Sequence, residues 1–203
     1  MKLHKFRSYG QYRRIQIKKN KDSIDRNYAI PEVMEAVAVY LKEHLPSATH
    51  GICHGAKNGL EVNALRDHLG IDVIGTDISP TAKKFDHMIQ WDFHEVKEEW
   101  RGRIDFIYSN TLDHSIDPPM CLDRWAETLR EGGVCILEWS PWHDENHSTP
   151  DDPFGASLEE YVEMLSKNFQ VRDVIELGTS ETDVYELART LVIAEKPMSS
   201  PPK

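Results

Sequence analysis

Cysteines are scarce in this sequence, and long apolar runs are absent. The 203 residues contain three cysteines, Cys53, Cys121 and Cys135, and none has the close pairing of a zinc site or a disulfide framework. The apolar runs are a few residues long, against the roughly 18 that a membrane span requires, and residues 1–21 lack the apolar core of a signal peptide. We therefore expect a soluble, cytoplasmic protein whose cysteines are reduced and structural.

Acidic residues are missing from residues 1–21, which carry eight Lys and Arg. The rest of the chain holds the other 16 of the 24 basic residues and all 34 acidic residues, so the net charge of −10 divides into a basic arm and a strongly acidic body. An acidic body repels polyanions, which disfavours nucleic acid as the main ligand. We expect the arm to lie on its own acidic body or on a sister subunit of a homo-oligomer.

The length is ordinary for one domain with additions. We assign residues 1–27 to a basic N-terminal arm, residues 28–197 to the folded domain and residues 198–203 to a disordered tail. Within the arm, Ile15 and Ile17 alternate with charged residues, and this period-two pattern predicts an edge strand or an extended segment.

Strand patterns alternate with helix patterns along the folded domain. Helix signals include Pro31 at a helix start and a capping box formed by Ser157 and Glu160. Seven segments have strand character, namely residues 50–53, 72–77, 87–91, 103–108, 134–139, 170–177 and 190–195. No crossover helix separates the last two. We therefore predict an α/β fold with a doubly wound, mostly parallel seven-stranded sheet that ends in an antiparallel hairpin.

A nucleoside site is predicted at the first βαβ unit, residues 50–80. Gly55 and Gly59 have no Cβ where the backbone would pass close to a ligand, and Asp77 ends the second strand, where it can accept both ribose hydroxyls. The same pattern serves NAD and FAD. A nicotinamide dehydrogenase should also have a contiguous G-x-G-x-x-G, which this sequence lacks.

Across residues 31–195 the chain resembles the class I S-adenosylmethionine-dependent methyltransferases. The resemblance is carried, in the family's order, by GICHGAKNG (51–59), VIGTDIS (73–79), QWDFHE (90–95), DFIYSNTLDHS (105–115), LREGGVCILEW (129–139) and the final hairpin. The first motif departs from the family pattern. His50 and Gly51 replace its usual acidic residue, and Cys53 and Lys57 stand where glycines are frequent.

This resemblance implies S-adenosyl-L-methionine as the cofactor. It implies that Asp77 binds the ribose and Ile78 packs on adenine. It also implies that Asp92 and the backbone of Phe93 bind the adenine edge, with Glu61 as a substitute for the missing acidic residue at the methionine amino group. The cofactor-binding residues that it implies are Cys53, His54, Gly55, Gly59, Glu61, Asp77, Ile78, Asp92, Phe93 and Asn110.

The acceptor side is predicted from chemistry. The sulfonium is already a strong methyl donor, so an amine or carboxylate acceptor needs little help, whereas a hydroxyl acceptor needs positioning and a base. Asp113 and His114 follow the fourth strand, at the edge of the sheet where such folds bind ligands, and we predict His114 or His143 as the base. The alternative role for His114 is helix capping or lining of the pocket.

The polar loop at residues 140–156 is long enough to predict a function. We favour a lid in which Trp139, Trp142 and Phe154 cover the acceptor. His143 and His147, with acidic neighbours, have metal-ligand spacing only on a helix, and three prolines in the loop disfavour a helix. We therefore predict a solvated loop and no metal.

The predicted function is methyl transfer to a small polar acceptor, for example a hydroxyl of a sugar or metabolite. Three alternatives stay open. The protein could bind the cofactor or S-adenosylhomocysteine without turnover, as a sensor or assembly partner, or it could be a nicotinamide dehydrogenase. The basic arm could also recruit nucleic acid as the acceptor, although residues 109–112 lack the N-P-P-Tyr sequence of many base methyltransferases.

Overall fold

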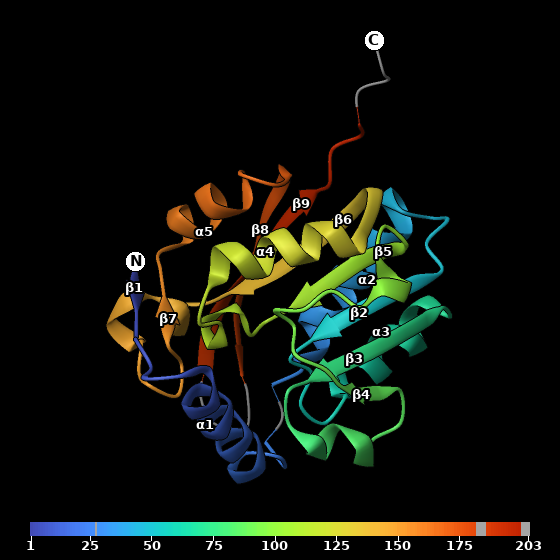
Figure 1. Cartoon of the computed structure of the whole chain (residues 1–203). Helices are drawn as coiled ribbons and strands as arrows, with labels where there is room; N and C mark the ends of the chain where they lie inside the picture. The colour runs from blue at the N-terminus through green and yellow to red at the C-terminus, as the bar shows by residue number, and fades with distance from the viewer. Residues whose placement is uncertain (27, 182–185, 200–203) are drawn as a thin grey trace.

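A seven-stranded sheet forms the centre of the molecule in the computed structural model, which describes residues 1–26, 28–181 and 186–199 (Figure 1). In spatial order the strands are β4 (Met88–Gln90), β3 (Asp72–Asp77), β2 (His50–His54), β5 (Ile104–Ser109), β6 (Leu129–Trp139), β9 (Glu186–Glu195) and β8 (Gln170–Glu181). The first five are parallel, whereas β9 pairs antiparallel with both β6 and β8. This arrangement confirms the predicted fold class.

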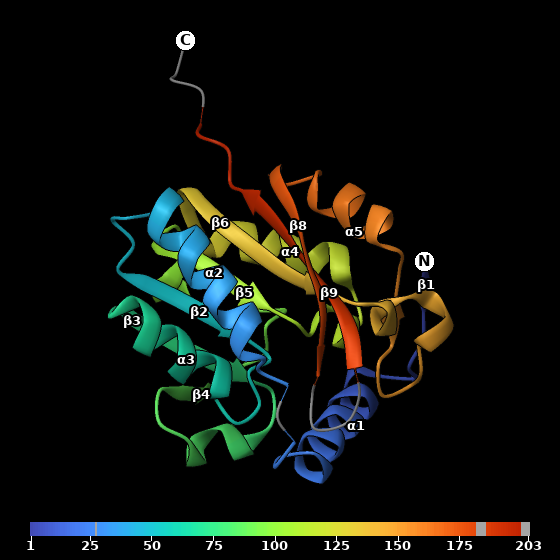
Figure 2. The same cartoon turned by 180° about the vertical axis from the view of Figure 1, so that it is seen from behind.

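Helices cover both faces of the sheet (Figures 1 and 2). On one face, α2 (Pro31–His44) and α3 (Leu60–Leu69) bury Val33 and Val62 against the sheet. On the other, α4 (Pro118–Thr128) and α5 (Leu158–Leu165) bury Trp125 and Leu165. The two apolar cores hold the parallel strands in place, and the loops that leave their carboxyl ends therefore start from rigid positions.

Local sequence signals account for several helix ends. The helix α3 lies between Gly59 and Gly70, which both have the left-handed backbone conformation that glycine tolerates, with φ of 77° and 68°. The capping box of Ser157 and Glu160 forms at the start of α5, as predicted. After Ser79 the chain forms a short 3₁₀-helix, η1 (Pro80–Lys84), with proline at its first position. The described residues also form the 3₁₀-helices η2 (Glu98–Trp100), η3 (Leu112–His114), η4 (Pro141–His143) and η5 (Glu145–His147).

The N-terminal arm is mostly helical, so the prediction of an edge strand or extended segment at Ile15 and Ile17 was wrong. The helix α1 (Tyr9–Asp22) buries Tyr12, Gln16 and Asn20, which are four residues apart and therefore share one face. The two isoleucines lie at the sides of that face and are half-buried. Their alternation with charged residues is therefore a coincidence of spacing.

The arm packs on its own chain, which is one of the two arrangements expected from its charge. A short strand, β1 (Lys2–Leu3), pairs antiparallel with β7 (Phe154–Gly155), which follows the loop at residues 140–153. Among the described residues no helix has the length and apolar character needed to cross a bilayer. Residues 182–185 of the connection between β8 and β9, and the last four residues of the predicted tail, lie outside the described part of the chain.

Candidate functional site

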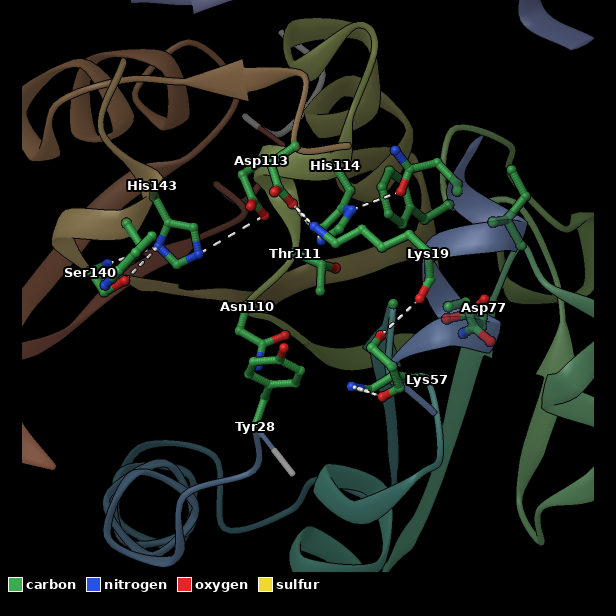
Figure 3. Close-up of a pocket in the computed structure, with 18 of the residues that line it drawn as sticks. Lys19, Tyr28, Lys57, Asp77, Asn110, Thr111, Asp113, His114, Ser140 and His143 are labelled. Atoms are coloured by element: carbon green, nitrogen blue, oxygen red, sulfur yellow. Dashed lines mark hydrogen bonds and ion pairs between the residues drawn. The ribbon is translucent and has the colours of Figure 1, made fainter. Parts of the chain in front are cut away.

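A cavity of about 270 Å³ lies at the carboxyl edge of the parallel strands, and Figure 3 shows it from close up. Its floor comes from residues that follow five strands in turn, namely Gly55, Ile78, Asp92, Asn110 and Ser140. The helix α1 and the loop after β6 lie over it, so the cavity is bounded by segments more than 100 residues apart in sequence. Parallel strands bring such residues together because all of their carboxyl ends meet at one edge.

Gly55 forms the turn that leaves β2, and the structure shows why a glycine stands there. Its φ is 72°, and a Cβ at this position would lie 2.0 Å from Oγ1 of Thr111. The hydroxyls of Ser109 and Thr111 donate to the carbonyl of His54 at 3.1 and 3.2 Å, which holds the exit of β5 against this turn. The close approach leaves backbone, without a side chain, at the cavity wall.

Asp77 ends β3 and faces the cavity. One carboxylate oxygen accepts from the backbone N–H of Ser79 at 2.7 Å. Burial raises the pKa of Asp77 to about 6, and polar groups of Ser79 and Asn20 partly offset the effect. Asn20, from α1, is oriented by the hydroxyl of Thr81, which donates to its Oδ1 at 2.5 Å. The first helix therefore takes part in this end of the site.

Glu61 occupies the first turn of α3 and is buried at the cavity wall. Burial raises its pKa to about 7. Asn110 donates to its Oε1 at 3.5 Å, a long hydrogen bond that leaves the carboxyl weakly held. Lys57 lies nearby, but its ammonium donates to the carbonyls of Ser23 and Arg26 at 2.9 and 3.0 Å, and so it ties the end of the arm to the glycine turn.

Asp92 lines the cavity, but both of its carboxylate oxygens already have partners. Oδ1 accepts from the backbone N–H of His94 at 3.0 Å and lies 2.7 Å from the His94 ring, and Oδ2 accepts from the hydroxyl of Tyr9. Burial alone would raise the pKa of Asp92, but these partners outweigh it and lower the pKa below its usual range. Ile78 and Phe93 supply apolar surface beside it.

Three of the predicted cofactor residues do not line the cavity. Cys53 is in the apolar core, where burial raises its pKa well above the usual range. The ring of His54 stacks on Trp125 at 4.9 Å, and burial lowers its pKa to about 3. Gly59 serves the start of α3. The other seven, Gly55, Glu61, Asp77, Ile78, Asp92, Phe93 and Asn110, are brought together at one site.

The second end of the cavity holds the predicted acceptor residues. Asp113 is buried, and its Oδ1 lies 3.9 Å from Nε2 of His143. Nδ1 of His143 accepts from the backbone N–H of Ser140 at 2.8 Å, so in the neutral ring the proton is on Nε2. Burial lowers the pKa of His143 to about 4, which keeps the ring neutral. With Nδ1 accepting this bond and the proton on Nε2, the neutral ring of His143 has no lone pair left to act as a base.

His114 has the opposite arrangement. Its Nδ1 lies 2.7 Å from Oε1 of Gln16, and Nε2 of Gln16 donates to the carbonyl of Asp151 at 2.9 Å. Because this second bond sets the orientation of the Gln16 amide, Nδ1 of His114 carries the proton and Nε2 has the lone pair. Nε2 lies 3.4 Å from Oδ1 of Asp152. Burial, followed by the charge of Lys19, lowers the pKa of His114.

A buried ion pair lies beneath this end of the cavity. Arg189, on β9, donates to Oε1 of Glu138 at 2.6 Å, and the hydroxyl of Tyr108 donates to Oε2 of Glu138 at 2.5 Å. Within the described residues, Nε and Nη2 of Arg189 have no hydrogen-bond partner. Arg189 also lines the cavity, so these donors fit an oxygen atom of a bound molecule.

The loop at residues 140–156 borders the cavity, as the lid hypothesis requires, but with fewer aromatic groups than predicted. Trp142 lines the cavity. Phe154 is buried beside Tyr161, and the Trp139 indole donates to the carbonyl of Ala156 at 3.1 Å. His143 and His147 lie in separate 3₁₀-helices and not on one α-helix.

The arm and Asp152 contribute to the cavity in a way that was not predicted from the sequence. Gln16, Lys19 and Asn20 all reach the cavity, and their spacing along one helix face is the signal that could have identified them. Asp152 contacts His114 across 38 positions, and nothing in its local sequence distinguishes it from the neighbouring Asp151.

No protein family profile matches the sequence, and no curated protein matches it. Solved structures are similar. The 1,6-didemethyltoxoflavin-N1-methyltransferase of Burkholderia thailandensis, with bound 1,6-didemethyltoxoflavin and S-adenosylhomocysteine, has a TM-score of 0.70 at 15% identity, over 96% of this chain and 93% of that one. A putative methyltransferase in complex with the Haloferax volcanii Trm112 methyltransferase activator has a TM-score of 0.69 at 18% identity, over 96% of this chain and 100% of that one.

The N-methyltransferase NodS from Bradyrhizobium japonicum, in complex with S-adenosylhomocysteine, has a TM-score of 0.65 at 16% identity, over 90% of this chain and 99% of that one. Each of these matches covers at least 90% of this chain. Together with the strand order and the cavity at the carboxyl edge, these matches establish that the chain has the fold of the class I S-adenosylmethionine-dependent methyltransferases.

Proposed function

We propose that the protein is an S-adenosylmethionine-dependent methyltransferase that acts on a small polar acceptor. The observation that carries the proposal is that Asp77, Glu61, Asp113 and His114 all line one cavity. Figure 3 shows Asp77 apart from Asp113 in this cavity. Two of the similar structures are methyltransferases with bound S-adenosylhomocysteine, which supports the assignment.

The residues at the first end fit the methyl donor. A carboxylate at the end of β3 suits the two ribose hydroxyls, and the apolar surface of Ile78 and Phe93 suits an adenine ring. Glu61 and Asn110 would bind the amino acid part, since the Glu61 carboxyl can accept further hydrogen bonds beside the long one from Asn110. When bound, the donor would supply a methyl group already activated on a positively charged sulfur, which an acidic cavity attracts.

The residues at the second end fit an acceptor with oxygen or nitrogen atoms. Nε2 of His114 would take the proton of an acceptor hydroxyl, because the hydrogen bond from Nδ1 to Gln16 leaves Nε2 unprotonated. The free N–H groups of Arg189 would bind a further acceptor oxygen. The helix α1 and the loop after β6 lie over the cavity, which favours a small acceptor over a polymer.

Calorimetric titration with S-adenosylhomocysteine tests the donor half of this proposal. We expect binding by the full chain and a loss of at least tenfold in affinity for Asp77→Asn, since this substitution removes a charged hydrogen-bond acceptor. The matched control is Asp67→Asn, which changes an exposed aspartate on α3 and should leave the affinity unchanged. Equal affinities for the two variants, or a response to NAD in place of S-adenosylhomocysteine, would contradict the assignment.

A second measurement distinguishes an active methyltransferase from a protein that binds the cofactor without transferring its methyl group. Methyl transfer from labelled S-adenosylmethionine to pooled small-molecule acceptors should be detectable and should fall at least tenfold in His114→Ala. Tight binding of S-adenosylhomocysteine with no transfer to any pool would favour a sensor or an assembly partner.

A further inference from the structure

Two carboxylates and an imidazole converge at the acceptor end of the cavity. Asp113 and His114 belong to η3, directly after β5, and Asp152 comes from the loop before β7. One ligand atom from each of the three residues lies within 4.8 Å of the others. The three side chains come from two separate loops, and both loops are anchored by β-strands.

The His114 ring is oriented as metal-bound histidines are. Its Nδ1–H donates to Gln16, whose own amide is held by the carbonyl of Asp151, so the Nε2 lone pair faces Oδ1 of Asp152 at 3.4 Å. Two hydrogen-bond acceptors that face each other with no proton between them repel. A cation between them removes the repulsion, and an outer hydrogen bond to the far ring nitrogen is the usual support for such a ligand.

Asp113 provides a second, independent observation. Its side chain is buried with 7% of the residue exposed, and its Oδ1 has no hydrogen-bond partner in the described part of the chain. The nearest basic group to this oxygen is Nε2 of His143 at 3.9 Å, too far for a hydrogen bond. A buried carboxylate oxygen without a partner is costly, and a bound cation is one way to satisfy it.

Lys19 is the positive group already present at this cluster. Its ammonium pairs with Oδ1 of Asp152 and reaches the cluster from α1 across the cavity (Figure 3). The single positive charge of Lys19 does not neutralise both carboxylates. Its ion pair is with Asp152 and not with Asp113. A divalent cation would displace the ammonium and satisfy both carboxylates together with Nε2 of His114.

We propose that Asp113, His114 and Asp152 bind a divalent transition-metal ion at the acceptor end of the cavity. One imidazole and two carboxylates suit Mn²⁺, Co²⁺ or Zn²⁺ better than Ca²⁺ or Mg²⁺, which prefer oxygen ligands alone. Three protein ligands leave coordination positions open toward the cavity, where an oxygen-bearing acceptor would bind.

The role toward the acceptor rests on the proposed methyl transfer. In the metal-bound protein the lone pair of His114 is used for coordination, and the charge of the metal would help a coordinated hydroxyl to lose its proton. The role of His114 as a base therefore applies to the metal-free protein only. Metal binding itself can be measured without any methyl donor.

The test is a Mn²⁺ titration of the full chain after dialysis against a chelator, with free Mn²⁺ measured by electron paramagnetic resonance. We expect one ion per chain and a loss of at least tenfold in affinity for Asp113→Asn and for Asp152→Asn. The matched control is Asp151→Asn, because Asp151 is an exposed neighbour whose carbonyl, not its carboxylate, contacts Gln16. Lys19→Met should raise the affinity severalfold, since it removes the competing positive charge.

Absence of Mn²⁺, Co²⁺ and Zn²⁺ binding in both the unmodified chain and Lys19→Met would overturn the proposal, as would equal losses in Asp151→Asn and Asp152→Asn. Circular dichroism melts check that the variants are folded. If Asp113→Asn does not fold, the result for Asp152→Asn is used alone, because Asp152 is half-exposed and its substitution should disturb the fold less. Titration of the same samples with S-adenosylhomocysteine keeps the two proposals separate. If the protein binds Mn²⁺ but not S-adenosylhomocysteine, the metal site stands and the donor assignment is refuted.

Discussion

At the scale of single residues, three buried carboxyl groups line the cavity. Asp77, Glu61 and Asp113 are each less than a tenth exposed, and burial is the main reason that each has a raised pKa. Perturbed carboxyl groups of this kind are concentrated at functional sites, where a ligand satisfies them. In their ionised form these buried groups lower the stability of the folded protein when no ligand is bound.

Donor binding should depend on pH through Asp77. Its pKa of about 6 means that the carboxylate form predominates at pH 7.5 and is lost as the pH falls through 6. Under the proposed function, this form would accept hydrogen bonds from the two ribose hydroxyls. The affinity for S-adenosylhomocysteine should therefore fall between pH 7 and pH 5. In Asp77→Asn this part of the pH dependence should disappear, as calorimetry across this range would show. An identical pH profile in the variant would assign the effect to another group.

Glu61 should destabilise the empty protein at alkaline pH. Its pKa is about 7 in the folded state against an ordinary value near 4.5, so the folded protein holds the proton more tightly than the unfolded chain. The destabilisation is therefore absent below about pH 4.5 and is fully developed above pH 7. Glu61→Gln should raise the free energy of unfolding at pH 8 by roughly 2 kcal/mol.

Urea unfolding of Glu61→Gln at pH 8 and at pH 4.5 measures this effect, with Glu35→Gln, an exposed position on α2, as the control. The gain should be present at pH 8 and nearly absent at pH 4.5. A loss of stability at pH 8 would mean that the Glu61 carboxylate has a structural partner that it needs.

At the scale of elements, the turn after β2 and the helix α1 decide the shape of the site. The turn requires glycine for two reasons, its positive φ and the 2.0 Å approach of a Cβ to Thr111. Gly70 has only the first of these two features. Its φ is 68°, but a Cβ there would meet nothing within 4 Å, so it serves as the comparison position. Gly70→Ala should cost about 1 kcal/mol for the backbone alone.

Gly55→Ala should cost about 2 kcal/mol more than Gly70→Ala and should also weaken the binding of S-adenosylhomocysteine, because either Thr111 or the turn must move. Urea unfolding and calorimetry of the two variants give both numbers. Similar stabilities of the two variants would show that the exit of β5 adapts freely to the added methyl group.

The helix α1 is the element that the sequence analysis assigned wrongly. Its buried face is polar, with Gln16 and Asn20 directed to the cavity, so a search for apolar periodicity finds only the half-buried Ile15 and Ile17. A polar face is stable against the body here because the body offers it polar partners, such as the carbonyl of Asp151. The buried face of α1 is polar because it lines a polar cavity.

At the scale of the whole molecule, the charge division between arm and body has a structural explanation within one chain. The basic arm packs on the acidic body through the pairing of β1 with β7 and through the ion pair of Lys19 and Asp152. These contacts place basic groups at the rim of a cavity rich in carboxylates. The carboxylates that line the cavity favour a ligand with positive or mixed charge over a polyanion.

Local residue patterns were enough to predict the sheet, its final hairpin and the position of Gly55 and Asp77 at its carboxyl edge. Strand and helix periods, glycine positions and Asp77 are properties of short segments, and backbone geometry converts them directly into elements at one edge of a parallel sheet. Only the tertiary structure decided that His54 packs into the core, that α1 covers the cavity, and that Asp152 meets Asp113 and His114. The physical reason is that these contacts join loops and an arm far apart in the chain, whose positions depend on packing and not on local residue patterns.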